Sequence, residues 1–265
     1  MSKNTIQEKA SILTNENIQG QYFQLVLSLP ERISTLQPGQ FVHVEIPNLK
    51  HRILRRPFSI SDADLEKKQW TIVYKVVGEG TQQLSQQTPG TILDILGPNG
   101  NGFSPIPQDI PAVILGGGYG CAAIFFLAHN AKQKPTVLLG ARDVEDILLA
   151  EKFKKLGCTV KISTDNGSLG TKGRITVLLE QYLKENPKCH IAACGPTPML
   201  KAVGQMAEKA GLDAELSMEE KMCCGVGVCF GCVIKVKDAT TPEGWSYTRT
   251  CEEGPVFPAS KIYWE

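Results

Sequence analysis

The sequence lacks a charge imbalance, a long apolar run and any cysteine before Cys121. Among 265 residues, 28 Lys plus Arg oppose 27 Asp plus Glu, which leaves a net charge of +1. Nucleic-acid binding requires a concentrated basic surface, so nucleic acid is excluded as the main partner. The longest apolar stretch, from Cys121 to Ala128, is far shorter than the ~20 residues that cross a bilayer. We therefore expect no membrane span.

The first ten residues, MSKNTIQEKA, lack the apolar core of a secretory signal. Hydrophobic residues make up 42% of the chain and charged residues 21%, a composition typical of globular proteins rather than disordered or fibrous ones. The composition and the missing signal predict a cytoplasmic protein with one large or two modest domains.

What the chain does have is nine cysteines. In a chain without a secretory signal, such a count indicates metal or redox chemistry more than a disulfide framework. Five of them fall between Cys223 and Cys251. This clustering places the expected metal site near the C-terminus.

Residues 1–104 show the two-residue alternation of half-buried strands, with Pro-Gly and Gly-Pro turn signals between them. A helical pattern of any length is absent apart from a short stretch at 82–86. The pattern predicts an antiparallel barrel or sandwich. Its clearest strand candidates are Phe23–Leu29, Val42–Ile46, Trp70–Val77 and Thr91–Leu96.

Residues 105–212 alternate short apolar strands with longer helical segments, which predicts βαβ units in a doubly wound parallel sheet. The Gly- and Pro-rich run 97–111 is the expected linker from the first domain. The strand candidates are Ala112–Leu115, Thr136–Leu139, Thr159–Ser163 and His190–Ala193, and the helix candidates are Cys121–Asn130, Glu145–Leu156, Ile175–Lys184 and Pro198–Ala210.

Residues 213–265 are rich in glycine and cysteine and have too few apolar residues for an independent core. One hairpin is expected, from Cys232–Lys237 and Tyr247–Cys251. We therefore expect a small third domain that needs a metal and a docking surface to fold.

The cysteines of this third segment have the spacing C-x4-C-x2-C…C, formed by Cys224, Cys229, Cys232 and Cys251. This is the spacing of plant-type [2Fe–2S] ligation, in which four thiolates hold two irons. Cys223 offers a competing register with Cys229, but the four-residue gap fits the pattern better. We therefore expect Cys223 to be a bystander.

A structural zinc site is the alternative reading of these cysteines. Zinc ribbons usually present two short C-x2–4-C knuckles, whereas the second half of this set supplies one cysteine. The remaining cysteines lie in the expected α/β domain, where a free thiol is most often a small core residue. These are Cys121, Cys158, Cys189 and Cys194.

A glycine-rich turn follows the first strand of the α/β domain and opens a helix, the place where a dinucleotide pyrophosphate meets helix N-terminal amides. Its glycines are Gly116, Gly117, Gly118 and Gly120. Cys121 occupies the third glycine position of G-x-G-x-x-G. Arg142 stands near the end of the next strand instead of a ribose-binding carboxylate. NAD is favoured over NADP by a small margin.

Together the motifs RRPFS, GEGT, GGGYG, CGPTPM and the C-terminal cysteine set closely resemble the ferredoxin–NADP reductase superfamily. More narrowly, the chain is similar to the electron-transfer subunits of class 1B dihydroorotate dehydrogenases. The resemblance covers nearly the whole chain, in the order barrel, nucleotide domain and cluster segment. It implies FAD, NAD and a [2Fe–2S] cluster as cofactors.

The resemblance also implies site residues. Arg56 would meet the FAD phosphates and Ser59 the isoalloxazine ring, while a glycine-threonine pair approaches the pyrophosphate. Lys75 stands where family members often carry arginine, which keeps the charge but loses bidentate geometry. The implied FAD residues are Arg56, Pro57, Phe58, Ser59, Val73, Tyr74, Lys75, Gly80 and Thr81.

For NAD, the resemblance implies the glycine loop and the turn Cys194-Gly195-Pro196, which brings the nicotinamide toward the flavin. The chain departs from the family after the glycine loop, where Cys121-Ala122-Ala123 replaces two prolines. No residue is expected to act as a catalytic acid or base, because hydride transfer between stacked rings depends on alignment and a dry pocket.

The function implied by the resemblance is electron transfer in pyrimidine biosynthesis. A partner subunit with FMN would oxidise dihydroorotate, and this chain would deliver the electrons to NAD+, in a heterotetramer of two copies of each subunit. Two alternatives stay open. One is a similar subunit of a bifurcating ferredoxin reductase or a sulfide dehydrogenase, and the other is a zinc-stapled nucleotide-binding regulator.

Overall fold

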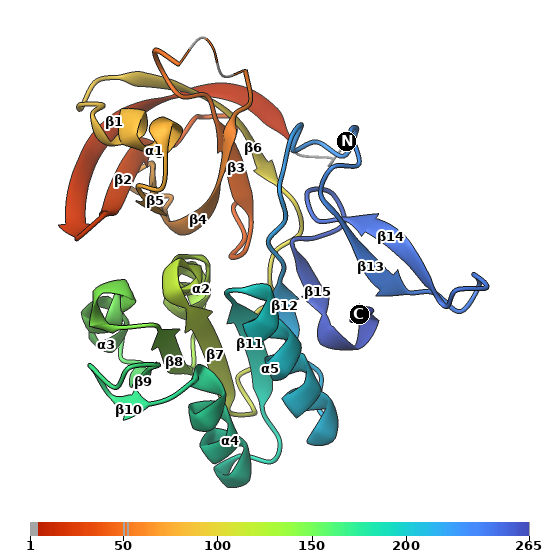
Figure 1. The fold of residues 1–265 in the computed structure, drawn as a ribbon. Helices are drawn as coiled ribbons and strands as arrows, with labels where there is room; N and C mark the ends of the chain where they lie inside the picture. The colour runs from red at the N-terminus through yellow and green to blue at the C-terminus, as the bar shows by residue number, and fades with distance from the viewer. Residues whose placement is uncertain (1–4, 50, 52, 265) are drawn as a thin grey trace.

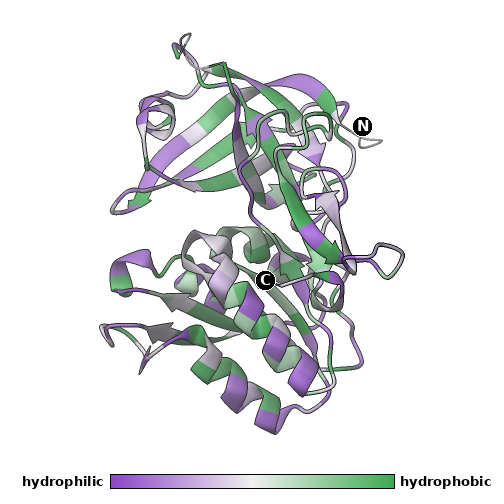
Figure 2. Cartoon of the chain, turned by 45° about the vertical axis from the view of Figure 1, so that its right-hand side comes forward, coloured by the Kyte–Doolittle hydropathy of each residue, from purple (hydrophilic) through white to green (hydrophobic). Residues whose placement is uncertain are grey.

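The computed structural model describes residues 5–49, 51 and 53–264. Figure 1 shows a β-barrel above a layered α/β domain, with a smaller cysteine-bearing segment beside them. Figure 2 shows hydrophobic and hydrophilic residues alternating along the barrel strands and the long helices. Within the described residues, no helix combines the length and apolar character needed to cross a bilayer.

The barrel is closed in the strand order β1-β2-β5-β4-β3-β6, and its neighbouring strands are antiparallel. This confirms the predicted barrel, since side chains that alternate along each strand fill one interior. Its elements are β1 (Ile6–Gln19), β2 (Tyr22–Ser28), β3 (Phe41–Val44), β4 (Arg56–Asp64), β5 (Gln69–Lys75), the short helix α1 (Glu79–Ser85) and β6 (Ile92–Asn99).

Strand β1 is the longest of the barrel and was not among the predicted strands. Its sequence is mostly polar, and only Ala10 and Ile12 of its residues are fully buried. It pairs with β6 along its first half and with β2 along its second half. Backbone pairing to two neighbours therefore determines this strand more than an apolar face does.

A seven-stranded sheet of order β10-β9-β8-β7-β11-β12-β15 forms the α/β domain. All pairings are parallel except the antiparallel pairing of β12 with β15. The predicted doubly wound sheet is confirmed. Its strands are β7 (Ala112–Gly117), β8 (Thr136–Ala141), β9 (Thr159–Thr164), β10 (Thr171–Lys172), β11 (His190–Cys194), β12 (Glu215–Ser217) and β15 (Val256–Pro258).

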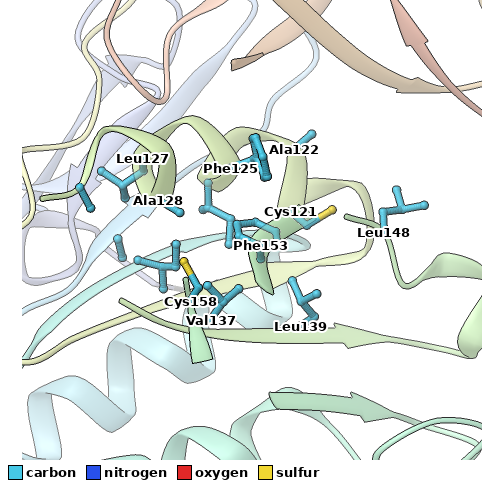
Figure 3. Packing of buried hydrophobic residues seen from close by; sticks show 14 of the residues in the cluster. Cys121, Ala122, Phe125, Leu127, Ala128, Val137, Leu139, Leu148, Phe153 and Cys158 are labelled. Carbon is cyan, nitrogen blue, oxygen red and sulfur yellow. The ribbon is translucent and has the colours of Figure 1, made fainter. Parts of the chain in front are cut away.

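Helices cover both faces of this sheet. The core beside α2 (Cys121–Asn130) and α3 (Ala150–Lys155) includes Phe125 and Phe153, whose rings meet edge to face at 5.0 Å (Figure 3). The other face packs α4 (Ile175–Glu185) and α5 (Thr197–Lys209). Cys121, Cys158 and Cys189 are buried in these cores, as predicted for three of the four scattered thiols.

Helix α2 also joins the two domains. Phe125 packs into the α/β core, whereas the next residue, Phe126, packs into the barrel core. A helix that is apolar on every side is one that is buried on every side. The uninterrupted apolar run from Cys121 to Ala128 is therefore explained by its place between barrel and sheet.

The predicted helix Glu145–Leu156 is shorter than expected. A single 3-10 turn spans Val144–Asp146, and α3 begins only at Ala150. Between them, Ile147 and Leu148 point into the core and Leu149 adopts a left-handed φ of 60°. The apolar residues interrupt the helix because they fill the core rather than one helical face.

The predicted linker 97–111 also begins later than expected, because β6 continues to Asn99. After β12, the chain forms a cysteine loop (residues 219–232), then the hairpin of β13 (Val233–Lys237) and β14 (Trp245–Arg249), close to the predicted hairpin. It then returns to the sheet as β15, a strand that was not predicted.

Candidate functional site

A cavity of about 300 Å³ lies where the barrel meets the α/β domain. One wall comes from β4 and β5, and the opposite wall from the start of α2 and the end of β11. The structure therefore brings together most of the residues predicted for flavin and nicotinamide. The predicted residues that line it are Arg56, Pro57, Phe58, Ser59, Val73, Tyr74, Lys75, Thr81, Gly120 and Cys194.

The two adjacent arginines of the RRPFS motif have different environments. Arg55 binds the carboxylates of Asp94 at 2.8 Å and Glu45 at 3.0 Å, which fixes it in the barrel wall. Arg56 lines the cavity and donates to the carbonyl of Leu54. Of these two arginines, Arg56 is therefore the one that presents a guanidinium to a ligand in the cavity.

Beside Arg56, helix α1 brings Gly80 and Thr81 close to the same wall. A Cβ on Gly80 would lie 3.0 Å from Nε of Arg56, so the glycine permits the guanidinium to pack against the helix. The Thr81 hydroxyl accepts from the Val77 amide at 2.9 Å and donates to the Gly78 carbonyl at 3.1 Å. Gly80 acts through Arg56 and does not itself line the cavity.

Lys75 at the end of β5 makes a contact that the sequence did not predict. Its Nζ lies 2.7 Å from Oδ1 of Asp146, which belongs to the α/β domain, and Tyr22 donates to the same oxygen. The Lys75 hydrogen bond, followed by that of Tyr22, lowers the pKa of Asp146. The residue predicted for flavin binding thus also ties the two domains together.

The glycine loop and the Cys194-Gly195-Pro196 turn pack directly on each other. A Cβ on Gly120 would lie 2.4 Å from the carbonyl oxygen of Cys194, and a Cβ on Gly117 would lie 2.9 Å from Cδ of Pro196. Both approaches require glycine. The predicted nucleotide motifs therefore form one surface at the carboxyl ends of β7 and β11, where doubly wound sheets bind nucleotides.

Within this surface, Gly116 and Gly118 have different requirements. A Cβ on Gly116 would lie 2.7 Å from Cα of Cys121, whereas Gly118 faces open space with a φ of +53°. Gly116 thus permits close packing of strand and helix, and Gly118 permits the turn between them. Gly116, Gly117, Gly118, Gly195 and Pro196 are not among the residues that line the cavity.

Sequence reasoning missed the part of the cavity formed by the chain after β12. Glu219 accepts from the Tyr119 hydroxyl at 2.9 Å, which connects the glycine loop to the start of the cysteine loop. No motif marks Glu219, because it reaches the cavity through the strand pairing of β12 with β11. The missed lining residues are Phe41, Val77, Tyr119, Ala122, Ser217, Met218, Glu219, Glu220, Met222 and Pro255.

In the cysteine loop, the four predicted ligands lie as two neighbouring pairs. The Cys229 amide donates to Sγ of Cys224 at 3.4 Å, and Cys232 packs with Cys251 in one buried cluster. A [2Fe–2S] cluster requires two thiolates on each iron. The side-chain arrangement fits that division, and in the described residues no three His, Cys, Asp or Glu side chains are grouped as one mononuclear ion would require.

Backbone amides of the loop point at these sulfur atoms. The Gly227 amide lies 3.2 Å from Sγ of Cys251, and the Val226 and Cys229 amides lie 3.5 and 3.4 Å from Sγ of Cys224. Burial raises the pKa of Cys224, but these donors outweigh it and lower the pKa to about 7. Amides directed at thiolates are what an iron–sulfur site needs.

Cys223 is exposed and hydrogen-bonds to Cys229. Exposure does not separate the two registers, because the predicted ligand Cys229 is exposed as well. The bystander role of Cys223 therefore stays a prediction, which substitution of the two neighbouring cysteines tests. Of the scattered cysteines, only Cys194 lines the cavity, where burial raises the pKa of its thiol to about 12.

The cavity and the cysteine loop share a wall. Phe41 and Met222 line the cavity, and the same two side chains pack with Cys232 and Cys251 in one small apolar cluster. Any group in the cavity is therefore one layer of side chains away from the paired thiols. Sequence reasoning did not find Phe41 or Met222, because an apolar residue at a strand start or in a loop carries no motif.

Comparison with known families matches the three parts of the chain in order. An oxidoreductase FAD-binding domain matches residues 6–103, an oxidoreductase NAD-binding domain residues 100–205, and the iron–sulfur cluster binding domain of dihydroorotate dehydrogenase B residues 219–263. Among curated proteins, the dihydroorotate dehydrogenase B (NAD(+)) electron transfer subunit of Caldanaerobacter subterraneus subsp. tengcongensis is 40% identical over 255 residues, 96% of this chain and 97% of the relative. This chain belongs to that family.

A second member, from Geobacillus kaustophilus, is 36% identical and covers 96% of this chain and 98% of its own. The protein is thus a flavin- and NAD-linked oxidoreductase subunit with an iron–sulfur domain. The iron–sulfur match contradicts the zinc alternative.

Solved structures show the same fold. The NADH-dependent reduced ferredoxin–NADP oxidoreductase, studied for flavin-based electron bifurcation, has a TM-score of 0.83 and 27% identity, and covers 96% of this chain and 90% of that one. The ferredoxin reductase of carbazole 1,9a-dioxygenase has a TM-score of 0.66 and 21% identity, over 78% of this chain and 67% of that one. At 21% identity, the similarity to the carbazole 1,9a-dioxygenase reductase shows a shared fold and carries no conclusion about function.

Proposed function

We propose that this chain transfers electrons from an FMN-containing dihydroorotate dehydrogenase subunit to NAD+, in pyrimidine biosynthesis. The observation that carries the proposal is the shared wall of Phe41 and Met222 between the cavity and the paired cysteines. A cavity of about 300 Å³ separated from the paired cysteines by one layer of side chains supports electron transfer between a flavin and a cluster.

The residues that form the barrel wall of the cavity are proposed to bind the flavin. Arg56 binds the phosphates with a charge-assisted hydrogen bond, and Ser59 and Tyr74 meet the ring system. The proposed set comprises Arg56, Pro57, Phe58, Ser59, Val73, Tyr74, Lys75, Gly80 and Thr81, of which all but Gly80 line the cavity.

The nucleotide residues are proposed as the opposing surface. The amides after β7 receive the pyrophosphate of NAD, and the turn after β11 directs the nicotinamide toward the flavin. The proposed set comprises Gly116, Gly117, Gly118, Gly120, Cys194, Gly195 and Pro196. The proposed cluster ligands are Cys224, Cys229, Cys232 and Cys251, and the proposed domain boundaries are 1–104, 105–212 and 213–265.

In this proposal the overall reaction is dihydroorotate plus NAD+ to orotate, NADH and a proton. A [2Fe–2S] cluster held by Cys224, Cys229, Cys232 and Cys251 would accept the electrons of the substrate from the partner subunit one at a time. FAD, when bound, supplies the conversion between one-electron and two-electron chemistry. The chain's own side chains position the ring and exclude water, and no acid or base of the chain is required.

The surface of the cysteine loop supports a partner protein at this point. Val228 and Phe230 are 68% and 60% exposed beside the ligand cysteines, and Arg249 lies 5.0 Å from the Phe230 ring. Exposed apolar side chains with an adjacent arginine are typical of interface cores. We place the partner subunit here, in a cytoplasmic heterotetramer with two copies of each chain.

Anaerobic co-purification with cofactor quantitation tests the proposal. Recovery of FAD, two irons per chain and an FMN-containing dihydroorotate dehydrogenase supports it, with the particle mass reporting the stoichiometry. A colourless, iron-free protein would defeat electron transfer altogether.

A second candidate is the corresponding subunit of an electron-bifurcating complex. The solved NADH-dependent ferredoxin–NADP oxidoreductase favours it through its TM-score of 0.83 over 96% of this chain. Recovery with a large multi-cluster flavoprotein, instead of a dihydroorotate dehydrogenase, would establish this candidate.

A further inference from the structure

His43 is a buried polar side chain at the wall between the barrel and the cysteine loop. It is 0% exposed, and neither Nδ1 nor Nε2 has a partner among the described residues. An unpaired buried polar group costs free energy, and a valine or leucine would pack there without that cost.

The direction of the ring follows from strand β3. Val42 and Val44 point into the barrel core, so Phe41 and His43 point out of it. Phe41 packs with Cys232 and Cys251, and the Phe41 and His43 rings lie 5.7 Å apart. His43 therefore faces the same segment as a residue that contacts two proposed ligands.

The cysteine loop is shaped to receive this ring. A Cβ on Gly225 would lie 2.5 Å from Nε2 of His43, and Gly225 has a φ of +69°. The glycine next to Cys224 thus lets the loop backbone lie against the Nε2 edge of the imidazole. A side chain at residue 225 would separate the ring from the loop.

Burial, followed by the charge of Arg55, lowers the pKa of His43 to about 4. The neutral ring carries one N–H donor and one acceptor nitrogen. Sulfur atoms of an iron–sulfur site accept hydrogen bonds, and such bonds tune the reduction potential.

We propose that His43 is a positioning residue that would donate a hydrogen bond from the barrel to an inorganic sulfide of a cluster in the cysteine loop, since no cysteine sulfur of the described residues accepts from its ring, and that this bond raises the reduction potential of the cluster. The inference rests on the proposed function, since it requires a cluster in the cysteine loop. On β3, His43 lies opposite Pro57 of the flavin motif. Strand β3 therefore lies between the proposed flavin-binding strand β4 and the cysteine loop.

The test is a redox titration of the purified holoprotein, in which the EPR signal of the reduced cluster is measured at each potential. His43→Leu removes the donor at similar volume and lowers the reduced-to-oxidised ratio at a fixed potential on the order of tenfold, typical of a hydrogen bond to a charged group. For a one-electron couple this is about 59 mV. His43→Gln keeps a donor and returns the potential toward that of the unsubstituted protein.

Val44→Ala is the matched control, because it lies on the same strand but faces the barrel core. It lowers stability and leaves the potential unchanged. An unchanged potential in His43→Leu, with iron and FAD retained, overturns the inference while leaving the proposed function intact. Absence of a cluster from the unsubstituted protein overturns both.

A second measurement can be made on the unsubstituted protein, which keeps the His43 imidazole. Pulsed EPR of reduced protein labelled with 15N-histidine is expected to show a weak nitrogen coupling to the cluster, which His43→Gln removes. If no histidine nitrogen couples to the cluster in the unsubstituted protein, the hydrogen bond does not exist and the inference fails, even where His43→Leu does not fold.

Discussion

Lys75 and Asp146 form an ion pair across the domain boundary, with 2.7 Å between Nζ and Oδ1. Lys75 ends the strand that lines the cavity, and Asp146 lies in the 3-10 turn before α3. Both side chains are about three-quarters buried, with 29% and 25% of their surfaces exposed. The orientation of the nucleotide domain on the barrel thus depends partly on a residue of the proposed flavin wall.

Asp146→Asn is expected to weaken this attachment. The variant should unfold with a free energy about 1 kcal/mol lower, and NADH should reduce the flavin more slowly because the domains are less firmly aligned. The Lys75 bond lowers the pKa of Asp146, so the stabilisation is present at neutral pH and is lost as the pH falls through that lowered pKa.

Urea unfolding of the two proteins checks this. The gap between them should stay constant from about pH 8 to about pH 5 and close only below about pH 4, the ordinary carboxylate range. Glu145→Gln is the control, because its exposed carboxylate lies in the same turn. A loss in the control equal to that in Asp146→Asn would assign the effect to the turn rather than to the ion pair.

Arg56→Gln should weaken FAD binding by at least tenfold, since a charge-assisted hydrogen bond contributes about 1.5–3 kcal/mol. Fluorescence titration of the apoprotein with FAD measures the change. Arg55→Gln should instead lower stability and leave FAD affinity nearly unchanged, because Arg55 binds Asp94 and Glu45. The reverse result would mean that the wrong arginine has been placed in the cavity.

Cys229→Ser should abolish the EPR signal of the reduced cluster while most of the FAD stays bound. The flavin wall belongs to the barrel, which folds around its own core. Cys223→Ala is the neighbouring control and should retain iron, since the exposed Cys223 is not one of the proposed ligands. Equal iron loss from Cys223→Ala and Cys224→Ala would show that the ligand register starts one residue earlier.

Gly120→Ala should separate the glycine loop from the turn after β11, because its Cβ would lie 2.4 Å from the Cys194 carbonyl oxygen. We expect flavin reduction by NADH to fall at least tenfold, while dithionite still reduces both centres. Stopped-flow absorbance at the flavin band measures the rate. Gly211→Ala is the control, because Gly211 has a φ of +70° and lies beyond the far end of α5, and this variant should lose stability only. Normal NADH kinetics in Gly120→Ala would show that the close packing of the loop on the turn is not needed for flavin reduction.

The sequence predicted the elements whose signals are local. Alternation marked barrel strands such as β2, and an apolar run marked α2. The cysteine spacing identified a loop whose amides meet sulfur atoms at 3.2–3.5 Å. Burial of one face, burial of all faces and metal ligation each involve residues that are close in the chain. Each requirement is therefore visible in the local sequence pattern.

What the sequence did not predict depends on contacts between distant segments. His43 resembles any polar residue in a strand until Gly225, which is far along the chain, is placed against it. Asp146 gains its partner from Lys75 in another domain. The predicted helix at Glu145–Leu156 was too long because Ile147 and Leu148 fill a tertiary core. No local pattern carries this information.

Strands β12 and β15 are adjacent in the sheet, although the cysteine loop and its hairpin separate them in the chain. Residues 218–255 are thus a closed excursion from one edge of the nucleotide sheet, with both ends anchored side by side. A terminal appendage on one tether could swing, and its redox centre would vary in distance from the cavity. We expect a doubly anchored excursion to hold the cysteine loop at one distance from the cavity, which favours electron passage through a fixed geometry.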